Sequence, residues 1–134
     1  MTNSTNTVSF TNISVVSPSG VLATGWEAVS ADAESTDLGE SIQWTSDKPL
    51  YWIPNGEPID ITLNSPVGNA CQTGAYLTGN GTTTIRCFGG TNGVDPNVGT
   101  KTGTTMVEAT QPSRMTVTLI GTGLEAMTFG LLVS

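Results

Sequence analysis

Eleven carboxylates, two cysteines and a few aromatic rings are the side chains of this 134-residue chain that could do chemistry. The chain has no histidine, so the commonest general base near neutral pH and the commonest metal ligand are both missing. A pair of carboxylates can hydrolyse a glycosidic bond, but no pair is singled out here by its spacing. The G-x-S-x-G motif that presents a nucleophilic serine is also absent. We therefore expect no catalytic residues and no enzymatic activity.

The two cysteines, Cys71 and Cys87, flank a segment that predicts a strand, a glycine turn and a second strand. If the turn centres on Gly79, Cys71 lies directly opposite Cys87, and the Cβ atoms of such a pair come close to disulfide range. This register predicts a Cys71–Cys87 disulfide. A two-residue turn at Asn80–Gly81 would shift the register and leave two buried thiols instead. Without a histidine or a second cysteine pair, the two thiols cannot complete a zinc site.

The aromatic residues are candidates for packing or for ligand contact, and their positions separate the two roles. Trp44 lies in a short alternating segment and is expected in the core. Tyr51 and Trp52 are adjacent on a predicted strand, so their side chains point to opposite faces and only one can enter a single core. The other is expected to contact a ligand, a partner or a neighbouring subunit, and Tyr76 is a further candidate for stacking on a sugar ring.

Oxygen ligands for calcium are the remaining chemical possibility. The segment 95–99 has oxygen donors at alternate positions but lacks the other acidic ligands of an EF-hand, so a plain Asp-Pro turn explains it better. The segment 27–40 is acidic without a basic residue, and we expect an exposed loop there with at most one helical turn. No cofactor is therefore expected, and calcium at one of these two segments stays an open alternative.

These residues must be positioned by strands, because apolar and polar residues alternate along much of the chain. The pattern is clearest at 115–119 and 127–133, which we expect to pair as an antiparallel hairpin. A second hairpin is expected between 42–44 and 50–53, and a strand beginning near 8 should turn a corner near Asn12. Two further strands are predicted at 59–63 and 104–109.

No segment carries a sustained helical stripe, so the fold class is all-β. We expect an antiparallel β-sandwich or jelly roll with about 7–9 short strands. The chain has no internal repeat and no linker, so a single domain should span 1–134, with 1–6 as a flexible N-terminal tail.

The charge pattern excludes several classes of partner. The formal net charge is −7, and the four basic residues are scattered, whereas binding a phosphate backbone needs clustered Lys or Arg. An anionic membrane surface is disfavoured for the same reason, and no apolar run approaches the roughly 20 residues of a spanning helix. The polar segment 1–7 lacks the features of a signal peptide. We expect neither nucleic-acid binding nor membrane insertion.

An acidic, charge-poor β-domain without catalytic apparatus is typical of an outer virion protein of a virus or bacteriophage, such as a decoration, spike or minor capsid subunit. We expect it to be made in the host cytoplasm, to join other virion proteins, and to form a homo-oligomer because few lysines protect its sheet edges. The alternative is a secreted or cell-surface module, lectin-like or adhesive, that binds glycans or surface proteins. In composition the chain resembles bacterial fimbrial subunits, and this resemblance implies no role for any single residue.

Overall fold

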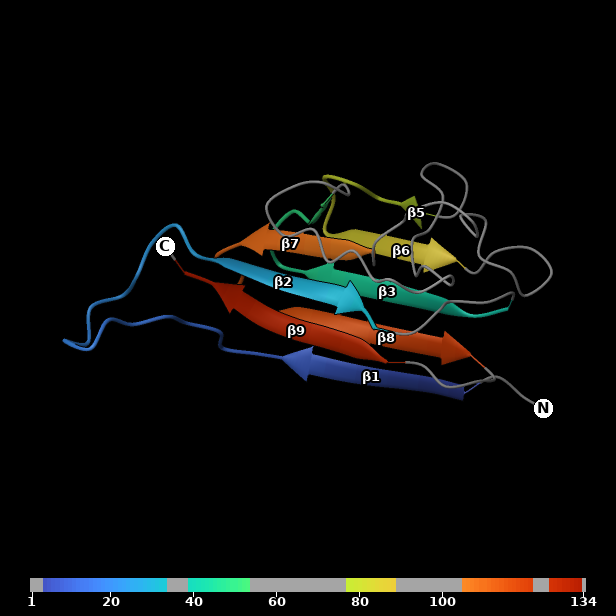
Figure 1. Ribbon diagram of the computed structural model, residues 1–134, viewed down its shortest axis with the longest axis horizontal. Helices are drawn as coiled ribbons and strands as arrows, with labels where there is room; N and C mark the ends of the chain where they lie inside the picture. Colours follow the sequence, from blue (N-terminus) through green and yellow to red (C-terminus); the bar gives the residue numbers. More distant parts are fainter. Residues whose placement is uncertain (1–3, 34–38, 54–76, 89–104, 122–125, 134) are drawn as a thin grey trace.

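The computed structural model describes residues 4–33, 39–53, 77–88, 105–121 and 126–133, and every element below lies within these ranges (Figure 1). No helix occurs in them. The strands, in chain order, are β1 (Ser4–Phe10), β2 (Glu27–Asp32), β3 (Ser41–Ser46), β4 (Tyr51–Trp52), β5 (Leu77–Thr78), β6 (Thr84–Phe88), β7 (Met106–Thr110), β8 (Met115–Gly121) and β9 (Met127–Leu132).

The strands form two antiparallel sheets that enclose one core. The first sheet has the strand order β1-β8-β3-β6-β5, and the second has the order β4-β7-β2-β9. Buried side chains from both inner faces belong to one cluster, which includes Ile42, Trp44 and Val117 from the first sheet and Ala28 and Val107 from the second. The predicted all-β sandwich is confirmed, and Trp44 is fully buried in its core as expected.

The alternating pattern predicted the buried face of β8 correctly, but the expected core face of 127–133 is only partly buried, with Leu131 and Val133 exposed, and the predicted strand pairs are wrong. Met115, Val117 and Leu119 are buried on β8, as the pattern indicates. However, β8 and β9 belong to different sheets, so the predicted hairpin between 115–119 and 127–133 is wrong. The predicted hairpin between β3 and β4 is wrong for the same reason. Alternation shows which face of a strand is buried and carries no information about the neighbouring strand.

The acidic segment that was expected to be an exposed loop begins with a buried strand. Residues 27–32 form β2, which lies between β7 and β9 in the second sheet. Ser30 on its inner face accepts a hydrogen bond from Trp44 Nε1 at 2.9 Å and donates one to the Thr128 carbonyl oxygen at 2.6 Å. Small residues such as Ala28 and Ser30 face the core here, so β2 lacks the large alternating side chains that make a strand recognisable.

The first strand begins earlier than expected and ends at the predicted corner. Residues 4–6, expected to belong to a flexible tail, pair with β8. After Phe10 the chain turns at Asn12, whose φ is 53°. The segment 13–23 then forms a hairpin arm, in which Val16 pairs with Leu22. The arm projects beyond the ends of the strands, on the side where the C-terminus lies (Figure 1).

The β5–β6 hairpin has a different register from the predicted one. Leu77 lies opposite Cys87, so the turn does not centre on Gly79 and the expected placement of Cys71 opposite Cys87 is wrong. Gly79 has a φ of 93°, and a Cβ atom there would overlap the Thr84 carbonyl oxygen, so only glycine fits. Cys87 is fully buried. Cys71 lies outside the described residues, as does the predicted strand 59–63, and the Cys71–Cys87 bond stays a prediction.

Candidate binding face

The outer face of the second sheet carries the most exposed aromatic ring in the described part of the chain. Tyr51 is 49% exposed. In the strand register Tyr51 lies opposite Glu108, Glu108 opposite Val29, and Val29 opposite Gly130. These residues therefore form one row across all four strands.

A second row lies two residues further along the same face. Glu27 of β2 stands opposite Thr110 of β7 on one side and Leu132 of β9 on the other. Side chains two apart on a strand share a face, so both rows belong to one surface. We call this surface the Tyr51 face; it consists of Tyr51, Glu108, Val29, Gly130, Thr110, Glu27 and Leu132.

Tyr51 and Trp52 differ as the sequence predicted for neighbours on a strand. The Tyr51 ring points outward, whereas Trp52 is half-buried and packs against the core. The backbone of Trp52 is held in place, because its N–H donates to Asn80 Oδ1 at 3.1 Å. The pair therefore supplies one anchored ring and one exposed ring. Tyr76, the third aromatic candidate, lies outside the described residues.

The β5–β6 turn lies against the backbone that carries Tyr51. The Gly81 N–H donates to the Leu50 carbonyl oxygen at 2.7 Å, and the Leu50 N–H donates to the Thr82 carbonyl oxygen at 2.8 Å. These bonds bring the turn against the start of β4. A Cβ atom placed on Gly81 would lie 3.6 Å from Tyr51 Cε1, so one edge of the ring rests close to the turn backbone. The turn therefore holds the backbone that carries Tyr51, while about half of the residue stays exposed.

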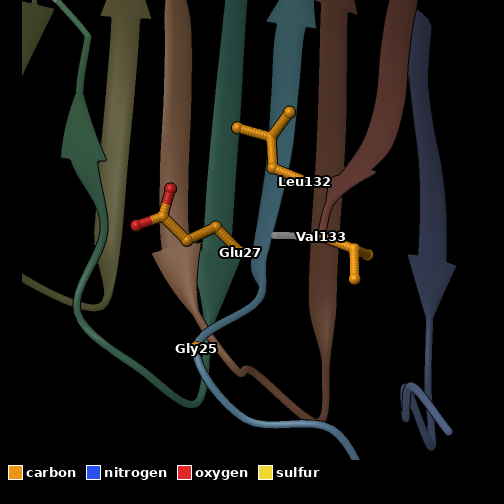
Figure 2. A pocket seen from close by; sticks show the side chains of 4 residues that line it. All are labelled: Gly25, Glu27, Leu132 and Val133. Carbon is orange, nitrogen blue, oxygen red and sulfur yellow. The ribbon is translucent and has the colours of Figure 1, made fainter. Parts of the chain in front are cut away.

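A shallow pocket adjoins the second row. It has a volume of about 280 Å³ and is lined by Gly25, Glu27, Leu132 and Val133. Figure 2 shows the Glu27 carboxylate leaning toward β7, with Leu132 and Val133 on the side away from that strand. The Gly25 N–H donates to the side-chain oxygen of Gln111 at 2.7 Å, which fixes one wall of the pocket. The pocket therefore offers a carboxylate acceptor beside apolar walls.

The two outer faces of the sandwich differ in charge. The strands of the second sheet contain Glu27 and Glu108 on the outer face and no Lys or Arg. On the first sheet, the Arg86 guanidinium instead lies 4.3 Å from the centre of the Phe88 ring. The other outward residues of the first sheet mainly bear hydroxyl groups. Two of them are in contact, with Ser9 Oγ 3.1 Å from Thr116 Oγ1. Of the two outer faces, the Tyr51 face is therefore the acidic one.

The described residues contain no cluster of three or more metal-ligating side chains. Of the two segments considered for calcium, 27–40 begins with the strand β2, which ends at Asp32, and its residues 34–38 lie outside the described residues, as does 95–99. Within the same ranges, no helix is long and apolar enough to cross a membrane.

Sequence reasoning found Tyr51 but missed the residues that accompany it. The loop expected at 27–40 includes Glu27, and the sequence pattern does not single out Glu108 or Leu132. A usable signal was present, because Glu27 and Val29 alternate with the small residues Ala28 and Ser30. This alternation assigns the two sets to opposite faces of a strand. It does not show that β4 and β7 lie beside β2.

The comparison with protein families gives one finding that bears on function. The chain matches the family described as surface adhesin CshA non-repetitive domain 2, over residues 1–133. Neither curated proteins nor solved structures give a match to this chain. The finding agrees with the alternative expectation, a surface adhesive module, and gives no support to a virion component or a location in the virion. Since the match covers nearly the whole chain, the chain belongs to the family of surface adhesin CshA non-repetitive domain 2.

Proposed function

We propose that this domain is a non-enzymatic adhesive module of the cell surface and that it binds its ligand through the Tyr51 face. The family supports the adhesive role. The observation that carries the choice of face is the Tyr51 ring, which is 49% exposed although the backbone on both sides of it is hydrogen-bonded to the β5–β6 turn. Large exposed aromatic rings that are held in place concentrate binding energy in protein interfaces and ligand sites.

The ligand that this face suits best is a neutral carbohydrate. An aromatic ring offers a flat apolar surface for the C–H face of a sugar, and a carboxylate such as that of Glu27 accepts hydrogen bonds from sugar hydroxyl groups. The strands of this sheet carry no Lys or Arg, so an acidic glycan would find no countercharge from them. The pocket beside Glu27 extends the surface from the aromatic row to a second contact point.

A glycan array followed by calorimetry on the best-bound glycan tests the proposal. Tyr51→Ala should weaken binding about 30-fold, equivalent to about 2 kcal/mol, whereas Tyr51→Phe keeps the stacking ring and should retain most of the affinity. Phe88→Ala is the matched control, because Phe88 is an exposed aromatic residue on the opposite outer face. Equal loss in Tyr51→Ala and Phe88→Ala would contradict the choice of face.

Binding to immobilised cell-surface material separates the face from the class of ligand. If Tyr51→Ala abolishes this binding and periodate oxidation of the surface sugars does too, both proposals are supported. If Tyr51→Ala abolishes it and periodate has no effect, the Tyr51 face is the adhesive surface but its ligand is not a carbohydrate.

A further inference from the structure

One edge of the sandwich combines exposed apolar side chains with a complete lack of charge. Residues 1–26 contain no Asp, Glu, Lys or Arg, and neither do β8 and β9. This stretch of sequence includes β1 and the arm. Of the nine large apolar side chains that are exposed among the described residues, seven belong to β1, the arm and the end of the chain from β9 onward: Val8, Val16, Val21, Leu22, Leu131, Leu132 and Val133. We call β1 and β9 together the uncharged edge.

The uncharged edge leaves part of the core side of the sandwich open. β1 and β9 are the edge strands of the two sheets on the same side, and the rings of Phe10 and Phe129 stack across the gap with their centres 3.9 Å apart. Val8 is on the inner face of β1, opposite Val117 in the register, yet it is 40% exposed. Leu131 is on the inner face of β9, opposite Ala28, and is 41% exposed.

β1 also has an unprotected backbone edge. It pairs with β8 on one side only, and it is seven residues long. Natural edge strands are commonly shielded by a lysine, a proline or an inward-pointing charge, and the sequence STNTVSF has none of these. Ser4 to Ser9 are all exposed, so no described segment covers the strand.

We infer that a second copy of this chain pairs with the uncharged edge, β1 against β1 in antiparallel orientation. Two copies that each carry a net charge of −7 repel one another, and they can approach most closely where neither has a charged side chain. A partner recognised by its positive charge would instead be drawn to the carboxylates, which lie elsewhere in the chain. The free backbone groups of an antiparallel edge are complementary to those of an identical strand related by a twofold axis.

This arrangement also covers two of the exposed apolar side chains. A twofold axis perpendicular to the sheet keeps the inner faces of both copies on the same side, so the two five-stranded sheets become one continuous sheet. The β9 strands of both copies then face each other across the β1 pair. Val8 and Leu131 of each copy lie in the space between them and are removed from water.

Sedimentation analysis from micromolar to about 1 mM protein tests the inference, since even a Kd near 1 mM populates a dimer in that range. We expect a species of twice 13.8 kDa. Val8→Lys places a charge in the seam and should raise the dimer Kd at least about 10-fold, because a charge buried without a partner is strongly unfavourable. Asn6→Lys should also raise the dimer Kd, and it adds the charge without removing an apolar group. Thr78→Lys is the matched control, because it adds the same charge to β5 at the other edge of the same sheet.

Hydrogen exchange shows directly which strand forms the interface. The β1 amides that do not bond to β8 should become protected as the protein concentration rises, and this protection should be lost in Val8→Lys. A mass of 13.8 kDa at every concentration would overturn the inference. So would a dimer that tolerates Val8→Lys and Asn6→Lys, a dimer that Thr78→Lys weakens equally, or protection that appears on other strands and not on β1.

Discussion

At the scale of single residues, the hydroxyl of Ser30 joins the two sheets of the sandwich. It accepts from Trp44 Nε1 across the core and donates to the Thr128 carbonyl oxygen within the second sheet. The contact with Trp44 is buried, so the indole N–H depends on the serine for its hydrogen bond.

Replacing this hydroxyl should therefore destabilise the fold more than its size suggests. Ser30→Ala leaves the indole N–H buried without an acceptor, and we expect the free energy of unfolding to fall by about 1–3 kcal/mol in urea titrations. Ser9→Ala removes a hydroxyl that bonds to another hydroxyl on the exposed face of the first sheet, and it should change stability by less than about 0.5 kcal/mol. If both substitutions lower the free energy of unfolding equally, the buried hydrogen bond contributes no more to stability than the exposed one.

Asp47 makes stability depend on pH. Its slight burial acts to raise its pKa, but hydrogen bonds from Ser113 Oγ and from the backbone N–H groups of Arg114 and Ser113 outweigh this and lower the pKa below 3.8. A lowered pKa means that the ionised carboxylate stabilises the folded state at neutral pH. That stabilisation is lost as the pH falls through the folded-state pKa.

The pH effect can be isolated by substitution. Asp47→Asn should reduce stability at pH 7 by up to about 1 kcal/mol, a small amount because the side chain is exposed. Because the pKa of Asp47 is lowered, the difference from the unmodified protein should persist through mildly acidic pH and shrink only when the pH falls through the folded-state pKa of Asp47. Urea unfolding at pH 7 and at a series of lower pH values measures this, and a difference that stays constant would exclude a role for the charge.

At the scale of elements, the β5–β6 turn connects the hairpin to the Tyr51 face, and Gly79 is its most constrained position. Gly79→Ala combines an unfavourable positive φ with overlap against the Thr84 carbonyl oxygen. We expect it to destabilise the protein by more than about 2 kcal/mol in urea titrations. Gly20→Ala is the matched control, because Gly20 also has a positive φ but no atom within 4 Å of its Cβ position, and it should lose only about 1 kcal/mol. Similar losses at both positions would mean that the overlap is relieved by movement of the turn.

The predicted Cys71–Cys87 bond also belongs to this scale. Cys87 is buried on β6, and the bond would tie that strand to a segment outside the described residues. Peptide mapping without reduction should recover the two cysteines in one linked fragment. Closing a loop of this length should contribute about 3 kcal/mol to stability. Two alkylatable thiols in the native, unreduced protein would refute the bond.

At the scale of the whole molecule, the two proposed surfaces share β9, but substitutions on β4 and on β1 should each affect only one of them. Tyr51 lies on β4 and Val8 on β1, which are edge strands of different sheets. Tyr51→Ala should therefore weaken ligand binding and leave the sedimentation profile unchanged. Val8→Lys should shift the sedimentation profile and leave ligand affinity per chain unchanged in calorimetry. Loss of both properties in either variant would indicate that the surfaces are coupled or that the variant misfolds.

The sequence by itself determined the features that depend on local backbone geometry. Alternation in 115–119 predicted the buried face of β8, and the adjacency of Tyr51 and Trp52 predicted that one ring would point outward. Both follow from the twofold repeat of an extended chain, which is a property of each strand alone. The two-residue alternation and the absence of a helical stripe likewise predicted the all-β class.

Only the tertiary structure decided which strands are neighbours. β8 and β9 are close in sequence yet lie in different sheets, and β2 is a central strand although its inner face has residues as small as Ala28 and Ser30. The Tyr51 face exists because β4, β7, β2 and β9 come together from four distant parts of the chain. Pairing between strands is set by how the side chains of both sheets fill one core, and that depends on all strands at once and on no single segment.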